Sequence, residues 1–167
     1  EVICSLMTDR KPLPGKLAFS RDLFVLLFLL RGMPFVDLAF LRRCDLQGNV
    51  ITYHRRKTSR KLTVVVGKEA MEIIQKYMYA IPDSPYLFPI IQNPGKDEYG
   101  QYARMLRLQN YRLTQVANIL GIRDRLSTYT ARHTWATTAL RQNYNSSLIC
   151  DAMGHSSVKV TETYFQP

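Results

Sequence analysis

Residues 20–43 read SRDLFVLLFLLRGMPFVDLAFLRR, and this stretch decides how the fold begins. The apolar run at 23–30 predicts a buried helix that starts at an N-capping serine, Ser20, and continues to about Arg31. A Gly-Met-Pro sequence then breaks the helix, and apolar residues at helical spacing resume over 36–43. We therefore expect two short helices that meet at a corner, with Arg31 at that corner.

The chain beyond this corner contains two strand-like runs and then further helical segments. β-Branched and aromatic residues fill 50–55 (VITYHR) and 62–66 (LTVVV), and a basic connection, 56–61 (RKTSRK), joins them into an expected hairpin. Further helices are expected at 69–79, 101–120, 128–143, 146–153 and 158–164. The predicted fold is mainly α with a small antiparallel β-sheet (α+β), and residues 1–167 are expected to form a single domain.

The composition favours a polyanionic partner. The 167 residues carry 23 Lys and Arg against 13 Asp and Glu, a net charge of +10, although charge alone does not distinguish DNA from RNA or a membrane surface. Three scattered cysteines indicate neither a zinc site nor a disulfide framework and fit a reducing cytoplasm. The longest apolar run is too short to cross a bilayer. With 46% apolar residues, the chain is expected to bury a real core.

A phosphodiester-cutting site without a metal ion is the leading hypothesis for the chemistry. Tyr164 follows His155 by nine residues, and Arg132 lies on a predicted helix among apolar neighbours. A tyrosine phenol is a poor nucleophile at neutral pH because its ordinary pKa is about 10, so cations must activate it and absorb the charge that develops on phosphate. Arg31 and Lys57 are the further candidates for those cations.

Each candidate also has a structural interpretation. A buried Arg132 needs an anionic partner, which could be a core carboxylate such as Asp37. His155 follows a glycine at an expected helix end, where a histidine often caps the helix or faces solvent. Lys57, at the tip of the hairpin, could clamp the phosphate backbone, protonate a leaving oxygen, or do both. We assign His133 to structure or to backbone contact.

Four segments together carry a resemblance to a known family. They are FSRDLFVLLFLLRGMPFVDLAFLRRCDL (19–46), ITYHRRKTSRKLTVVV (51–66), TYTARHTWATTAL (128–140) and MGHSSVKVTETYF (153–165). In this order and spacing they resemble the C-terminal catalytic domain of the tyrosine recombinase, or phage integrase, family. The first and third segments look most like integrases of Bacteroides-type mobile elements.

The resemblance implies an active site for site-specific DNA strand exchange that uses no metal and no cofactor. Residue by residue, Tyr164 matches the nucleophile, Arg132 the second arginine, Lys57 the hairpin lysine and His155 the second histidine. In this family the tyrosine attacks the scissile phosphate and forms a 3′-phosphotyrosyl link. Because that link preserves the phosphodiester energy, the resemblance implies no nucleotide either.

Two positions depart from the family pattern. Tyr129 stands where the family has its first histidine, the usual candidate for the proton acceptor. Pro34 stands where the family has its first arginine, and Arg31, three residues earlier, is the nearest substitute. Asp37 matches the acidic position that buttresses the site.

The basic hairpin and the helix that carries Arg132 are expected to touch the DNA backbone. The expected residues are Arg55, Arg56, Arg60, Lys61 and His133. The resemblance also implies a tetramer of the full-length protein on two double-stranded DNA sites, associated with the nucleoid in the bacterial cytoplasm. The family's N-terminal core-binding domain and C-terminal tail are expected to lie outside this chain.

Two other functions remain open at this point. A non-catalytic DNA-binding module would keep the fold and lose activity through the changes at Pro34 and Tyr129. A type IB topoisomerase would share the chemistry and relax DNA without exchanging partners.

Overall fold

The computed structural model describes residues 2–9 and 11–164. Its helices are α1 (Val2–Thr8), α2 (Gly15–Leu29), α3 (Phe35–Ala39), α4 (Lys68–Tyr77), α5 (Glu98–Leu120), α6 (Thr128–Arg141), α7 (Ser146–Met153) and α8 (Val158–Glu162). The strands are β1 (Leu46–Gln47), β2 (Val50–His54) and β3 (Lys61–Val65), and a short 3-10 helix, η1 (Arg43–Asp45), precedes β1. The expected class, mainly α with a small antiparallel sheet, is confirmed. None of the helices in the described ranges combines the length and the apolar character that crossing a membrane requires.

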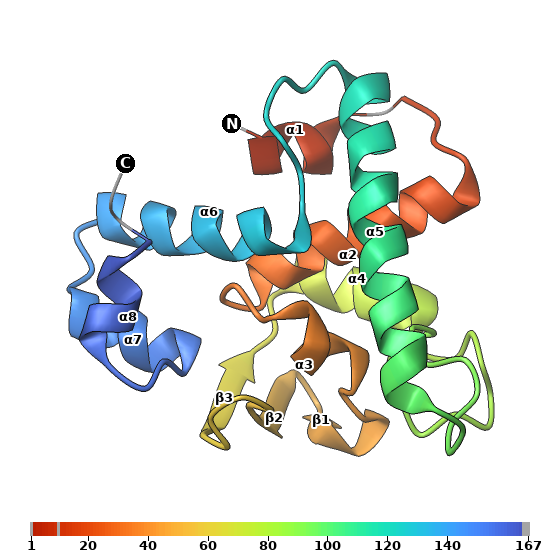
Figure 1. The fold of residues 1–167 in the computed structure, drawn as a ribbon, viewed down its shortest axis with the longest axis horizontal. Coiled ribbons are helices and arrows are strands. Elements are labelled where there is room, and N and C mark those ends of the chain that lie inside the picture. Colours follow the sequence, from red (N-terminus) through yellow and green to blue (C-terminus); the bar gives the residue numbers. More distant parts are fainter. Residues whose placement is uncertain (1, 10, 165–167) are drawn as a thin grey trace.

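Helix α2 forms the centre of the main core. Leu23, Leu26 and Leu27 are fully buried, and helices α1, α4, α5 and α6 contact α2. Figure 1 shows α2 (orange) in the middle of the molecule, with α5 and α6 beside it. A helix that is apolar on all sides is stable only in the interior, so the apolar run places α2 there.

A smaller core joins α6, α7 and the segment that ends at Tyr164. Its buried members are Ala136, Ala139, Ile149, Met153 and Tyr164. In Figure 1, α7 and α8 lie together at one end of α6, on the side of the molecule away from α4 and α5. The last described part of the chain therefore folds back onto α6.

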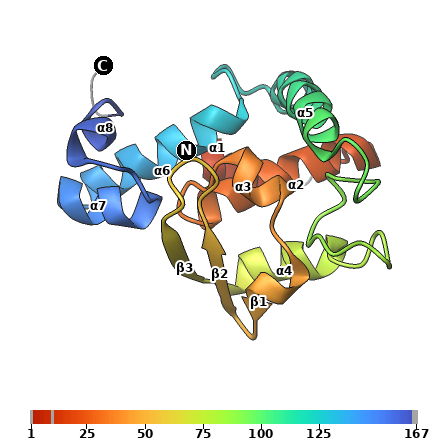
Figure 2. The same ribbon diagram turned by 60° about the horizontal axis from the view of Figure 1, so that its bottom comes forward.

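The sheet has the strand order β1-β2-β3 and is antiparallel throughout. Strands β2 and β3 pair from Val50 opposite Val65 to His54 opposite Lys61, which confirms the expected hairpin. Side chains alternate between a buried and a solvent-facing side along β2. Figure 2 shows the β2–β3 loop, residues 55–60, at the opposite end of the sheet from the β1–β2 turn.

Helix α2 starts earlier than the sequence predicts. It begins at Gly15 after Pro14, whose missing N–H costs little because the first N–H groups of a helix have no intrahelical partner. Ser20, expected as the N-cap, is buried inside the helix, so that prediction is wrong. The helix ends at Leu29, and Arg31 adopts a left-handed φ of 59° at the corner.

The helix after the corner is shorter than expected. It ends at Ala39 because the backbone then leaves the helix to pair with the chain that follows α4. Arg42 forms an isolated bridge with Tyr86, and the Leu87 N–H donates to the Leu41 carbonyl at 2.8 Å. The later helices begin and end within a few residues of their predicted bounds, whereas α1 and β1 were not expected from the pattern.

Candidate active site

Arg132 lies at the centre of the candidate site. It projects from α6 and is 5% exposed. Its guanidinium donates to the carbonyls of Gly32 and Met153, the latter at 3.0 Å, and lies 2.6 Å from His155 Nε2. These contacts use three of the N–H groups of a guanidinium, and since arginine has about five, at most two stay available for a phosphate.

The surroundings of Arg132 lower the pKa of its guanidinium. Burial lowers the pKa of the guanidinium, the charge of Arg55 lowers it further, and the Tyr164 phenol acts in the opposite direction. An arginine keeps its proton at neutral pH despite such a shift. A phosphate that reaches this side chain therefore meets a cation that has already lost much of its water, where attraction is stronger than in solvent.

The corner between α2 and α3 holds its backbone directly against Arg132. Gly32 has a φ of 65°, and a Cβ at this position would lie 3.2 Å from the Arg132 Cα, so a side chain would crowd α6. Arg31 donates from Nη1 to the Thr63 carbonyl at 3.5 Å, which directs its side chain to β3. Pro34 stands at the N-cap of α3. The assignment of Arg31 as the substitute guanidinium stays a prediction, and it requires the side chain to leave β3.

The C-terminus of α7 supplies carbonyl acceptors to two arginines. The Met153 carbonyl accepts from Arg55 and from Arg132, each at 3.0 Å, and the Gly154 carbonyl accepts from Arg55 at 3.1 Å. The last carbonyls of a helix lack intrahelical partners and carry partial negative charge, so cations bind them well. Gly154 closes α7 with a φ of 64°, and a Cβ there would lie 2.7 Å from the Arg55 Cδ. This position therefore requires glycine.

The structure corrects the expectation for Arg55. The side chain is buried, and its Nε donates to the Asp37 carboxylate at 3.2 Å, so Arg55 holds the hairpin to α3 and α7 instead of facing DNA. Asp37 also accepts from the Arg56 N–H at 2.9 Å. Burial raises the pKa of the Asp37 carboxyl, while the Arg56 N–H and Arg55 oppose the rise. The alternative in which Asp37 pairs with Arg132 is also corrected, since the Asp37 ion pair is with Arg55.

His155 connects Arg132 to helix α8. Its side chain is 4% exposed, so the alternative of a solvent-facing histidine is wrong. Nε2 faces Arg132, and Nδ1 lies 2.8 Å from Thr161 Oγ1. Burial, followed by the charges of Arg132, Arg55 and Lys57, lowers the pKa of His155 to about 4. The imidazole is therefore neutral at pH 7.

Tyr164 lies against three other rings and is 8% exposed. Its ring centroid is 5.4 Å from that of His155, 5.7 Å from that of Tyr129 and 5.9 Å from that of His133. Tyr129 is exposed, and burial, followed by the Tyr164 phenol, raises its pKa. A protonated phenol can donate a hydrogen bond but is no base. His133, expected as a DNA contact, packs against Tyr164.

Lys57 lies on the exposed β2–β3 loop beside the site. Its charge is the smallest of the causes that lower the pKa of His155. Thr58 Oγ1 donates to the Gly154 carbonyl at 3.3 Å and so holds the loop to the end of α7. The loop that carries Lys57 is thus held next to His155, and the role of Lys57 stays a prediction.

The other basic residues of the hairpin differ in how they are held. The Arg56 guanidinium lies over the Phe40 ring, 3.9 Å from its centroid. Arg60 donates to the His155 carbonyl and forms an ion pair with a carboxylate of α7 at 3.1 Å. Lys61 is exposed at the start of β3. All of them except the buried Arg55 keep part of their surface toward solvent.

Thr161 is a site residue that the sequence did not single out. It lies three residues before Tyr164, and residues at this spacing share one face of a helix. That spacing was the available signal, but it does not reveal that the Thr161 hydroxyl meets the His155 ring.

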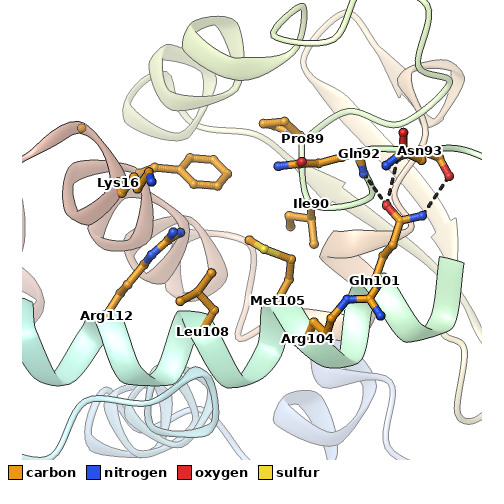
Figure 3. Close-up of a pocket in the computed structure, with 12 residues that line it drawn as sticks. Lys16, Pro89, Ile90, Gln92, Asn93, Gln101, Arg104, Met105, Leu108 and Arg112 are labelled. Carbon is orange, nitrogen blue, oxygen red and sulfur yellow. Dashed lines mark hydrogen bonds between the residues drawn. The ribbon is translucent and has the colours of Figure 1, made fainter. Parts of the chain in front are cut away.

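A separate cavity of about 560 Å³ lies between the start of α2, the loop at 89–93 and α5 (Figure 3). Lys16, Arg104 and Arg112 line it, and none of the candidate active-site residues does. Gln101 holds the loop through both ends of its amide, with hydrogen bonds to loop backbone atoms at 2.8 and 2.9 Å. The cavity adds positive charge next to α5 but lies apart from the candidate chemistry.

Residues 3–167 match the phage integrase family. A curated relative, the tyrosine recombinase XerC of Thermodesulfovibrio yellowstonii, is 26% identical, and the match covers 92% of this chain and 52% of that protein. The chain thus spans about half the length of this relative.

Solved structures of recombinases have a similar fold. The XerH site-specific recombinase bound to its difH substrate in a pre-cleavage complex gives a TM-score of 0.71 at 17% identity, over 98% of this chain and 47% of that one. XerA recombinase gives 0.69 at 19% identity, over 99% and 55%. The Tn1549 transposon integrase in complex with transposon right end DNA gives 0.67 at 14% identity, over 98% and 59%. At such identities the likeness concerns the fold alone.

Proposed function

This chain belongs to the phage integrase family, and we propose that it is the catalytic domain of a site-specific DNA recombinase. The observation that carries the proposal is the meeting of Arg132, His155 and Tyr164, which come from α6, from the end of α7 and from the end of α8. A cation, a neutral imidazole and a phenol in one place are the groups that transfer of a phosphoryl group to tyrosine requires. The net charge of +10 adds general attraction for DNA.

In the proposed reaction, the Tyr164 oxygen forms a bond to the scissile phosphorus as its phenolic proton passes to solvent water. The bond from phosphorus to the 5′-oxygen breaks, and the Lys57 ammonium gives that oxygen a proton. The products are a 3′-phosphotyrosyl link and a free 5′-hydroxyl. A 5′-hydroxyl from another strand then attacks the phosphorus of the link and gives its proton to Lys57. The bond from phosphorus to Tyr164 breaks, and the phenol takes a proton back from solvent water, which completes one strand exchange.

Arg132 is proposed to bind the non-bridging phosphate oxygens with the N–H groups that its protein contacts leave available. Those oxygens gain charge in the transition state, where oriented donors in a dry site contribute most. His155 assists in holding and orienting the phosphate. Arg31 is proposed as the second guanidinium, and Asp37 keeps the hairpin in place through Arg55.

Tyr129 is proposed to donate a hydrogen bond to a phosphate oxygen where other family members use a histidine. Its ring packs against that of Tyr164 and is 59% exposed, so it stands between the nucleophile and solvent. Because the exposed Tyr129 ring stacks on the buried Tyr164 ring, we propose that DNA entry displaces the Tyr129 ring.

The remaining cations of the hairpin are proposed to hold the DNA backbone. Arg56, Arg60 and Lys61 keep exposed surface for phosphates, and His133 contributes only when Tyr164 moves away from it. Contacts of this kind position the duplex without reading its sequence, and they weaken as salt rises.

The whole protein is proposed to act as a tetramer on two DNA sites. The chain spans about half of its XerC relative, and the proposal assigns to the rest of the protein a core-binding domain that clamps the other face of the duplex. The proposed place of action is the bacterial cytoplasm, on DNA of the nucleoid, and the proposed origin is a mobile element of the Bacteroides type.

A nicked suicide duplex tests the proposal, because cleavage next to the nick releases a short strand and traps the covalent intermediate. DNA that flanks the gene supplies the candidate sites. The wild-type protein and Tyr144→Phe, which alters an exposed tyrosine, should form a covalent adduct, whereas Tyr164→Phe should form none. An adduct of equal yield from Tyr164→Phe refutes the nucleophile.

Two further outcomes of this experiment identify the other candidate functions. Specific DNA binding without any adduct indicates a non-catalytic module of the same fold. An adduct without strand transfer between two duplexes, together with relaxation of supercoiled DNA, indicates a type IB topoisomerase. Both outcomes contradict the proposed recombinase.

A further inference from the structure

The imidazole of His155 is contacted on three sides. Arg132 Nη2 lies 2.6 Å from Nε2, Thr161 Oγ1 lies 2.8 Å from Nδ1, and the Tyr164 ring stacks on its face at an interplanar angle of 20°. Thr161 is completely buried. Its hydroxyl is therefore shielded from water, and the imidazole is its partner across the packing interface.

These contacts determine which nitrogen of His155 carries the proton. A guanidinium has only donors, so Nε2 must present its lone pair to Arg132. The ring proton then lies on Nδ1 and is donated to the Thr161 hydroxyl oxygen. A threonine hydroxyl can accept as well as donate, so both ring nitrogens have a partner without a charge on the ring.

We propose that Thr161 is a positioning residue that holds His155 in its Nδ1-protonated form and thereby keeps Nε2 as an acceptor for Arg132. In this state His155 acts on the phosphate through Arg132, because its Nε2 has no hydrogen to donate. Without Thr161, the buried Nδ1–H loses its acceptor, which favours transfer of the proton to Nε2, where it would oppose the guanidinium and turn it out of its present orientation.

The position of Thr161 links the protonation of His155 to the placement of the nucleophile, Tyr164. Thr161 lies on α8, three residues before Tyr164, and both are buried against the same imidazole. The docking of one short helix therefore places the phenol and sets the histidine proton together. The hydrogen bond from His155 to Thr161 also orients the contact between His155 and Arg132. Its loss should therefore weaken the whole Thr161–His155–Arg132 network and not one bond alone.

The protonation of His155 can be measured directly by nitrogen NMR on the protein labelled with 15N-histidine. The wild type should show a protonated Nδ1 and an unprotonated Nε2 at pH 7. Thr161→Val, which removes the hydroxyl and keeps the shape, should show a mixture or a protonated Nε2, and Thr161→Ser should resemble the wild type. A protonated Nε2 in the wild type, or an unchanged ring in Thr161→Val, overturns the proposal. If Thr161→Val does not fold, a protonated Nε2 in the wild type still overturns the proposal.

The kinetic consequence rests on the proposed function. At saturating DNA, Thr161→Val should slow single-turnover cleavage about five- to tenfold, as expected for one lost hydrogen bond in the site. DNA affinity should change less than about twofold. Thr161→Ser should restore most of the rate, and Thr163→Val, an exposed change on the same segment, should leave it unaltered. Equal rates for Thr161→Val and the wild type overturn the proposal, whereas absence of cleavage by every protein, with the expected NMR result, refutes only the proposed function.

Discussion

At the scale of single residues, the orientation of Arg132 is set before DNA arrives. Its bonds to the Met153 carbonyl and to His155 fix the guanidinium, so little reorganisation is needed when charge develops on the phosphate. Arg31 is close along the corner but is bound to β3. Its contribution therefore depends on whether its side chain moves when DNA binds.

We predict that Arg31→Ala slows cleavage about as severely as Arg132→Ala. Loss of one oriented donor in comparable sites costs roughly 2.7 to 4 kcal/mol of transition-state stabilisation. Single-turnover cleavage at saturating protein measures this effect apart from DNA binding, and Pro34→Arg in the Arg31→Ala background should restore part of the rate. A normal rate for Arg31→Ala, with only a salt-dependent loss of affinity, would assign Arg31 to the DNA backbone.

Lys57 is predicted to be the proton donor because it is exposed on the loop beside His155. A substrate with sulfur at the 5′-bridging position leaves as a thiolate and needs no proton. It should therefore rescue cleavage by Lys57→Ala and leave Tyr164→Phe inactive. If sulfur does not rescue Lys57→Ala, the lysine holds the DNA backbone instead.

His155 should make stability depend on pH. Its pKa is about 4 in the folded protein, whereas an unfolded histidine has a pKa of about 6.5, so the unfolded state binds the proton first as the pH falls. The contribution of neutral His155 is complete above about pH 6.5 and is lost as the pH falls toward 4, on the order of 2 kcal/mol by pH 4.5. Urea unfolding at pH 7 and 4.5 should show that His155→Gln loses less stability than the wild type. Equal losses would contradict the lowered pKa.

At the scale of elements, α7 contributes mainly through its last turn. The helix ends at a glycine with a left-handed backbone, and its free carbonyls bind Arg55 and Arg132. A helix end without side-chain caps thus becomes the anchor for the two arginines that come from the hairpin and from α6.

Gly154→Ala is predicted to destabilise the protein more than Gly121→Ala does. Both glycines close a helix with a positive φ, 64° and 68°, but only at Gly154 would the new Cβ meet other atoms, with Arg55 Cδ at 2.7 Å. Gly121→Ala should cost about 1 to 2 kcal/mol for the backbone alone, and Gly154→Ala should cost at least about 1 kcal/mol more. Denaturant unfolding measures both. Equal losses would show that the contact with Arg55 relaxes freely.

At the scale of the whole molecule, the site forms only if the two hydrophobic cores keep a fixed position relative to each other. The main core surrounds α2, and the smaller one joins α6 and α7 to Tyr164. Helix α6 contacts both α2 and α7, and Arg55 adds a second connection from the hairpin to α3 and α7. The site therefore depends on residues that do not touch DNA.

Arg55→Ala should lower the free energy of unfolding by about 3 kcal/mol or more, because it leaves the buried Asp37 carboxylate without its cation. Arg104→Ala is the control, since its ion pair with Asp97 is exposed and long at 3.9 Å, and it should cost less than about 0.5 kcal/mol. Hydrogen exchange should rise in α7 and α8 of Arg55→Ala and change little in α2. If Arg55→Ala lowers the free energy of unfolding as little as Arg104→Ala does, Arg55 does not stabilise the connection of the hairpin to α3 and α7.

The sequence by itself determined the class of fold and the order of the site residues. An eight-residue apolar run can only be an interior segment, alternating β-branched residues predict a hairpin, and the spacing of Arg132, His155 and Tyr164 follows a family pattern. These features are local, or depend on residue order, so they can be read without knowing which distant segments touch. The class of fold, the hairpin and the later helices are confirmed.

Only the tertiary structure decided which member of the basic run 55–61 lies inside. Arg55 and Arg56 are adjacent and chemically identical, yet Arg55 is buried against Asp37 and the end of α7, whereas Arg56 is exposed and lies over the Phe40 ring. The same holds for Thr161, whose hydroxyl meets an imidazole six residues earlier only because α8 folds back. A charge or a hydroxyl is tolerated in the interior only where distant groups satisfy it, and which groups those are depends on packing between elements that no local pattern records.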